Sequence, residues 1–228
     1  MQKKTLKVAV LRFPGTNCEF DTQYAFGKLG HSTELVWHED ENLPANIDLV
    51  VVPGGFSYGD YLRSGSIARF SPVMKAVQKY ANNGGNVLGI CNGFQILTEA
   101  GLLPGALKRN NNLHFISKHQ NLCVINSDNA FLNQCTKGEV LNIPIAHADG
   151  NYYIDDKGFK ELEENGQILL RYSDEKGNPV VVNGSVTSIA GVCNKNKNVF
   201  GLMPHPERAL EAILGSKDGI RMLKGFES

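Results

Sequence analysis

The chain has 228 residues, of which 42% are hydrophobic and 20% are charged, which is typical of a folded globular protein. Its 23 basic and 23 acidic residues cancel, so net charge offers no general attraction to nucleic acid or to an acidic membrane. No apolar run approaches the roughly 20 residues of a membrane span, and the five cysteines lack C-x-x-C spacing. These features predict a reduced, cytoplasmic protein without a disulfide framework or a metal site.

The first hundred residues alternate between strand and helix patterns. Apolar segments rich in branched residues predict strands at residues 6–11, 33–37, 49–52 and 86–90. Helices are predicted between and after them, at about residues 16–30, 72–82 and 94–100. Such alternation favours right-handed crossovers and a parallel sheet covered on both faces. The prediction is therefore a doubly wound α/β fold with a mostly parallel sheet and a flavodoxin-like core.

The first of these helices is predicted to begin with a capping box. Thr16 and Glu19 have the spacing at which each side chain can bond the other residue's backbone N–H. Phe20, Tyr24 and Leu29 can share one face of the helix that follows.

The second half of the chain is less regular. Residues 107–180 are more polar and are predicted to be strands and loops of the same domain. Two strands are predicted at residues 185–192 and 199–203, joined by the polar turn 194–198. The expected organisation is one domain spanning residues 1–228.

The sharpest local motif is Gly89-Ile90-Cys91-Asn92-Gly93, between a predicted strand and a predicted helix. It has the form of a nucleophile elbow, in which a tight strand-to-helix turn exposes a reactive side chain. Cys91 would lie at a helix N-terminus, whose partial positive charge favours a thiolate. The alternative is a buried cysteine in a glycine-flanked turn.

A base and an oxyanion site can be assigned to other strand ends. His205 lies between two prolines, and Glu207 could accept a hydrogen bond from its second ring nitrogen. The backbone N–H groups of Asn92 and Gly55 are candidates for stabilising an oxyanion. Taken alone, a histidine between prolines is more often a surface residue, and a Pro-Gly-Gly turn often only ends a strand.

Together these motifs resemble the class I, or triad-type, glutamine amidotransferase domain. The resemblance covers essentially the whole chain and rests on three segments: Pro53-Gly54-Gly55, Gly89-Ile90-Cys91-Asn92-Gly93-Phe94-Gln95 and Pro204-His205-Pro206-Glu207. It implies that Cys91 attacks the carboxamide of glutamine, giving a γ-glutamyl thioester and ammonia. It also implies that His205 acts as base and acid, that Glu207 orients it, and that Gln95 helps to hold the substrate.

The segment from Gly54 to Gly65 resembles the glutaminase subunits of one purine-biosynthetic synthase. The resemblance implies that ammonia passes to a large synthetase subunit, with a small third subunit completing the complex. The large subunit would use ATP and Mg²⁺ to convert formylglycinamide ribonucleotide to formylglycinamidine ribonucleotide. This chain has no Walker-type phosphate loop, so we expect no cofactor in it.

One segment departs from the family pattern, and other functions remain open. The family often reads His-Gly-Glu-Gly where this chain has His147-Ala148-Asp149-Gly150, and the shorter aspartate leaves this loop's role undecided. An amidotransferase for guanylate or cytidylate would share the triad but pair with another synthetase. A cysteine hydrolase of related fold would not need His205 and Glu207, and a binding subunit would need no triad.

Overall fold

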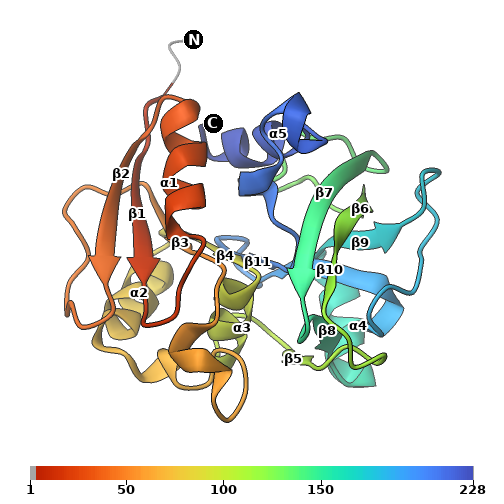
Figure 1. Ribbon diagram of the computed structural model, residues 1–228, viewed down its shortest axis with the longest axis horizontal. Helices are drawn as coiled ribbons and strands as arrows, with labels where there is room; N and C mark the ends of the chain where they lie inside the picture. The colour runs from red at the N-terminus through yellow and green to blue at the C-terminus, as the bar shows by residue number, and fades with distance from the viewer. Residues whose placement is uncertain (1–3, 228) are drawn as a thin grey trace.

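The computed structural model describes residues 4–227, and nine of the strands in this part form one mixed sheet (Figure 1). The strand order is β2-β1-β3-β4-β11-β10-β9-β6-β7. The bounds are β1 Lys7–Arg12, β2 Ser32–Trp37, β3 Leu49–Val52, β4 Asn86–Ile90, β6 Ile116–Val124, β7 Val140–His147, β9 Ile168–Ser173, β10 Ile189–Cys193 and β11 Val199–Leu202. A separate two-stranded sheet pairs β5 (Ala106–Lys108) with β8 (Asn151–Tyr153).

The prediction of a doubly wound α/β fold is confirmed. Strands β2, β1, β3, β4 and β11 are parallel neighbours. The chain leaves β1 towards β2 in one direction and continues from β3 to β4 in the other, so right-handed crossovers place α1 and α2 on opposite faces. Figure 1 shows this arrangement. The helices are α1 (Glu19–Lys28), α2 (Pro72–Asn82), α3 (Asn92–Glu99), α4 (Asp156–Glu164) and α5 (Gly219–Lys224).

The second half of the sheet is antiparallel, so the sheet is mixed and not mostly parallel as the sequence had suggested. Strands β10, β9, β6 and β7 pair antiparallel with one another, and β10 pairs antiparallel with β11. The sequence did not predict α4, which buries a single side chain, that of Leu162. Residues 186–188 form a 3-10 turn, so the strand predicted from residue 185 begins at Ile189.

The predicted capping box does not form. The N-cap of α1 is Cys18, without a side-chain cap, and the Thr16 hydroxyl accepts a hydrogen bond from the Phe13 N–H at 3.0 Å. The Glu19 carboxylate pairs instead with Arg12 at 3.1 Å. The Glu19 side chain, which the capping box would need, is instead engaged in an ion pair with a residue of β1.

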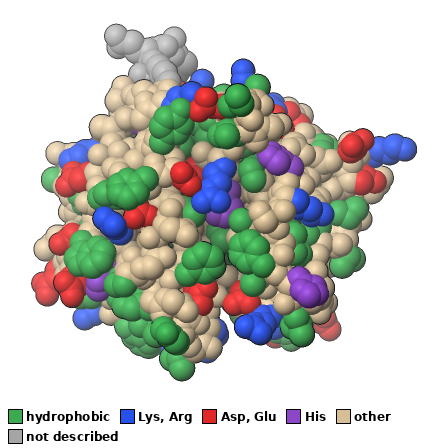
Figure 2. All heavy atoms as spheres, viewed as in Figure 1, with side chains coloured by type: hydrophobic (Ala, Val, Ile, Leu, Met, Phe, Trp, Pro, Cys, Tyr) green, Lys and Arg blue, Asp and Glu red, His purple; other side chains and the backbone are tan. Residues whose placement is uncertain are grey.

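The predicted shared face of α1 is largely exposed, and Figure 2 shows hydrophobic side chains at the surface where Figure 1 places this helix. Phe20 and Tyr24 have exposed fractions of 58% and 56%, whereas Leu29 is buried. The face that packs on the sheet carries Ala25 and Phe26.

Among residues 4–227, no helix is both long enough and apolar enough to span a membrane.

Gly93 marks the tightest approach between α3 and the sheet. A Cβ atom built there would overlap the backbone carbonyl oxygen of Val52 at the end of β3. Because backbone cannot move aside cheaply, we expect Gly93→Ala to lower the free energy of unfolding by about 3 kcal/mol or more. Urea unfolding followed by circular dichroism measures this change.

Gly27 provides the matched control. It lies within α1, and a Cβ atom built there meets nothing within 4 Å. Gly27→Ala should therefore stabilise the protein slightly, by about 0.5–1 kcal/mol, because alanine restricts the unfolded chain. Equal unfolding midpoints for the two variants would show that the contact between α3 and β3 is not tight.

Candidate active site

Cys91 stands on a strained turn between β4 and α3. Its φ and ψ angles are 52° and −106°, a backbone conformation that non-glycine residues rarely adopt. Its N–H donates to the carbonyl of Leu202 at 2.8 Å, which ties the turn to the end of β11. The Cys91 side chain is 6% exposed and lines a cavity of about 240 Å³. The sequence motif thus has the backbone geometry of a nucleophile elbow.

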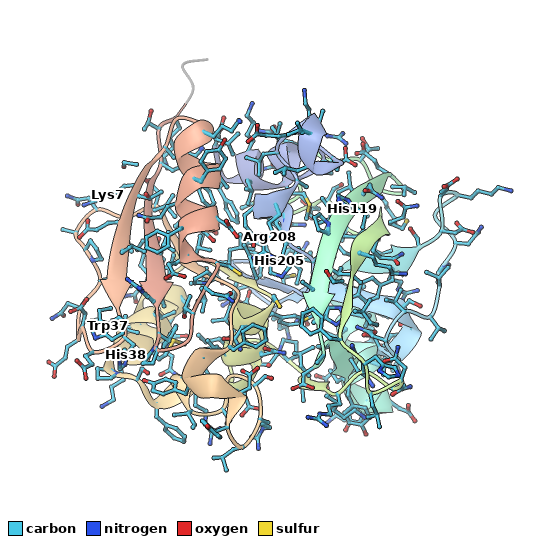
Figure 3. All side chains as sticks on the ribbon, viewed as in Figure 1. Lys7, Trp37, His38, His119, His205 and Arg208 are labelled. Atoms are coloured by element: carbon cyan, nitrogen blue, oxygen red, sulfur yellow. The ribbon has the colours of Figure 1, made fainter. Side chains whose placement is uncertain are left out.

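His205 and Glu207 form a buried pair just after β11. The His205 Nδ1 atom lies 2.6 Å from Glu207 Oε1, and the two residues are only 2% and 3% exposed. The His205 N–H donates to the Pro144 carbonyl at 2.8 Å, fixing this loop against β7. Since Glu207 occupies Nδ1, the Nε2 atom is left to serve Cys91. Figure 3 shows His205 near the centre of the molecule, beside Arg208.

The charges around His205 favour its protonated form. Burial by itself would lower the pKa of the imidazole. The negative charge of Glu207, and after it that of Cys91, outweighs burial and raises the pKa to about 10. At neutral pH the His205 imidazole is therefore protonated, and it lies against Glu207.

The two proposed oxyanion donors lie at neighbouring strand ends. Gly55 follows β3 and lines the same cavity as Cys91. Gly55 and Thr16 form an isolated antiparallel β-bridge, in which the Phe56 N–H donates to the Gly15 carbonyl. Asn92 is the first residue of α3, where a helix N–H has no intrahelical acceptor. Parallel strand ends at a switch point are where such sheets bind ligands.

The side chains of Asn92 and Gln95 are occupied within the protein. The Asn92 Oδ1 atom accepts from the Ser57 N–H at 3.1 Å, and its Nδ2 donates to Gln95 Oε1 at 2.9 Å. Gln95 Nε2 donates to the Asp149 backbone carbonyl at 2.7 Å. Gln95 lines the cavity, but both ends of its amide hold neighbouring segments in place.

Sequence reasoning assigned no role to several residues that line the cavity. These are Asn17, Cys18, Phe56, Asp60, Ser64, Phe115, Ala146, His147, Ala148, Asp149 and Arg208. Burial lowers the pKa of His147 to about 4, with a contribution from His205, so its imidazole is neutral at pH 7. Asp60 belongs to the segment from Gly54 to Gly65 that carries part of the family resemblance, and Arg208 directly follows the segment Pro204-His205-Pro206-Glu207; these positions were the available signal for them.

Cys18 approaches the triad from α1. Its sulfur accepts from Arg208 at 3.1 Å, and burial raises the pKa of its thiol well above the usual range. Atoms of Cys18, His205 and Glu207 lie within 4.8 Å of one another, so this group could hold a metal ion. The Glu207 Oε1 atom bonds His205 Nδ1 at 2.6 Å, so a metal ion bound to both of those atoms would replace this hydrogen bond.

The comparisons with known proteins agree with this geometry. Residues 5–218 match the model of the CobB/CobQ-like glutamine amidotransferase domain, and the chain belongs to this family. Among its relatives, phosphoribosylformylglycinamidine synthase subunit PurQ of Sulfurimonas denitrificans is 68% identical over 97% of this chain and 99% of that protein. The same subunit of Wolinella succinogenes is 66% identical, again over 97% and 99%.

Solved structures point the same way. A chain in the structure of PurLQS from Thermotoga maritima matches with a TM-score of 0.87 and 42% identity, covering 98% of both chains. A glutamine amidotransferase from the same organism matches with a TM-score of 0.59 and 16% identity over 90% of this chain and 78% of that one. The second match supports the fold alone.

Proposed function

We propose that this chain is the glutaminase subunit of phosphoribosylformylglycinamidine synthase. It hydrolyses glutamine to glutamate and ammonia and passes the ammonia to the synthetase subunit for de novo purine biosynthesis. The observation that carries the proposal is the triad: Cys91 on its elbow and His205 line one cavity, and buried Glu207 bonds His205 from behind. The PurQ relatives, matched over nearly their whole length, specify the synthase.

In the first half of the reaction, Cys91 attacks the carboxamide carbon of glutamine. The oxyanion that forms accepts hydrogen bonds from the Gly55 and Asn92 N–H groups. The His205 imidazolium then gives its proton to the departing nitrogen, releasing ammonia and leaving a γ-glutamyl thioester on Cys91. Glu207 stabilises the imidazolium throughout and keeps its Nε2 atom directed at the sulfur.

In the second half, water replaces ammonia. Neutral His205 takes a proton from the water as it attacks the thioester carbon. Collapse of the second tetrahedral intermediate breaks the carbon–sulfur bond and frees glutamate, and Cys91 with protonated His205 is restored. The balance is one glutamine and one water consumed, and one glutamate and one ammonia formed, with no cofactor needed in this chain.

The remaining assignments belong to the same proposal. Gln95 acts on substrate indirectly, because its hydrogen bonds position Asn92 and the Asp149 loop. ATP and Mg²⁺ bind the synthetase partner, a small third subunit completes the complex, and the assembly works in the cytoplasm. The continuous nine-stranded sheet supports a single domain over 1–228, although residues 1–3 and 228 lie outside the described part.

Covalent labelling tests the proposal directly. An electrophilic glutamine analogue, the chloroketone of glutamine, is incubated with the native chain and with Cys91→Ser, each alone and with the synthetase subunit. We expect one adduct on the native chain and none on the variant, read by intact mass. Labelling only with the synthetase present would mean that the pocket forms on assembly. No labelling in either condition, or equal labelling of both chains, would refute the glutaminase assignment.

A further inference from the structure

Two acidic side chains face the cavity that contains Cys91. Asp60 follows β3, in the loop 56–62, and Asp149 follows β7, so they come from distant parts of the chain. Burial, and then the negative charge of Asp149, raises the pKa of the Asp60 carboxyl to about 6. The charge of Asp149 thus acts on the Asp60 carboxyl, and two carboxylates that line one cavity repel each other unless a cation lies between them.

Both aspartates are held in place by hydrogen bonds to neighbouring residues. Asp149 Oδ2 accepts from the Ser64 hydroxyl at 2.8 Å, and the Asp149 backbone carbonyl accepts from Gln95. Asn92 Nδ2 lies 3.5 Å from Asp60 Oδ1. The pair is thus fixed to α3, the helix that follows Cys91.

The charge of this pair is poorly compensated within the protein. The Asp149 Oδ1 atom is buried and has no hydrogen-bond partner among residues 4–227. The Arg109 Nε atom forms an ion pair with this oxygen at 3.6 Å, and the Arg109 side chain is 77% exposed. Exposed ion pairs of this kind contribute little. The Asp149 side chain is 25% exposed, and its Oδ1 atom accepts no hydrogen bond from the described residues, in a cavity that a second carboxyl also lines. Such an oxygen is suited to accept a hydrogen bond from a positively charged donor.

We propose that Asp149, assisted by Asp60, binds the α-ammonium group of glutamine; this inference rests on the glutaminase function proposed above. Gln95, which holds Asp149, is one helical turn from Cys91, a rise of about 5.4 Å. In glutamine, three carbon–carbon bonds separate the carboxamide carbon from the α-carbon. A substrate with its carboxamide at Cys91 can therefore extend its ammonium group towards Asp149. The pair would select free amino acids over other carboxamides.

The test compares two substrates on matched variants of the assembled complex. The substrates are glutamine and 4-carbamoylbutanoate, which is glutamine without its α-amino group. We expect Asp149→Asn to lower kcat/KM for glutamine about 10- to 100-fold, mainly through KM, and to leave the poor turnover of 4-carbamoylbutanoate unchanged. Asp60→Asn should act in the same direction with a smaller effect.

Two further variants complete the design. Asp149→Glu keeps the charge and should retain the preference for glutamine. Asp128→Asn removes an aspartate whose side chain is 93% exposed and pairs with Lys197, and it should behave as the native complex does. If Asp149→Asn kept the native ratio between the two substrates, or slowed both equally, the ammonium assignment would be wrong. Failure of the native complex to hydrolyse glutamine would instead overturn the proposed function itself.

Discussion

Replacing Cys91 with alanine is expected to abolish glutamine-dependent synthesis by the complex while leaving ammonia-dependent synthesis intact. The thiol is the only group placed to form the thioester in the proposed mechanism, so the glutamine-dependent rate should fall by about 10⁴-fold or more. Added ammonia enters the reaction after the step that Cys91 performs. Both rates are measured on the same preparation, with glutamine or an ammonium salt as the nitrogen donor.

Cys123→Ala is the control for this experiment. Its thiol is partly buried in β6, and it does not line the cavity. It should retain both activities. If Cys91→Ala lost the ammonia-dependent rate as well, Cys91 would have a structural role at the interface, and the division of labour between subunits would be wrong.

Replacing Glu207 with glutamine is expected to have the second-largest effect. The amide cannot supply the negative charge that stabilises the His205 imidazolium, so kcat should fall by about 10³-fold or more. The pH profile should move as well. Because the charge of Glu207 raises the pKa of His205, its removal lowers that pKa from about 10. His205 then loses its proton at lower pH, and the alkaline limb of the kcat profile shifts to lower pH.

The profile is measured between pH 6 and 10 on the assembled complex. Glu163→Gln is the control, since Glu163 is 54% exposed and pairs with Arg171 at 3.7 Å on the far part of the sheet. It should leave both kcat and the profile unchanged. A Glu207→Gln enzyme with a reduced rate but an unshifted alkaline limb would mean that Glu207 orients His205 without tuning its proton affinity.

The parallel half of the fold could be read from the sequence with few errors. The segments 49–52, 72–82 and 86–90 coincide with β3, α2 and β4 residue for residue. Strands buried on both faces are continuously apolar, and their ends are marked by glycine and proline, so local pattern and tertiary role agree there. The antiparallel half was harder, because the long strand β6 carries consecutive exposed polar residues near its start and alternates buried with half-buried residues only in its second half.

The candidate site likewise contains residues that the sequence singled out and residues that only the structure brought together. Cys91, His205 and Glu207 stood out in the sequence as candidates because each lies in a short motif at a strand end, where the backbone restricts the residue types around it. Sequence could not bring Asp60 and Asp149 to one cavity. Their meeting depends on how the loops after β3 and β7 approach each other.

What the amino-acid sequence determined by itself is the set of reactive groups and the strand-to-helix turn that presents the nucleophile, because both depend on neighbours within a few residues. Only the tertiary structure decided which side chains surround those groups. Contacts between distant segments bury the His205–Glu207 hydrogen bond and bring the Cys18 thiol beside it. Such contacts also link Asp60 to Asp149 through Asn92 and Gln95. Burial and charge at such contacts set proton affinity and substrate choice, and no local pattern encodes them.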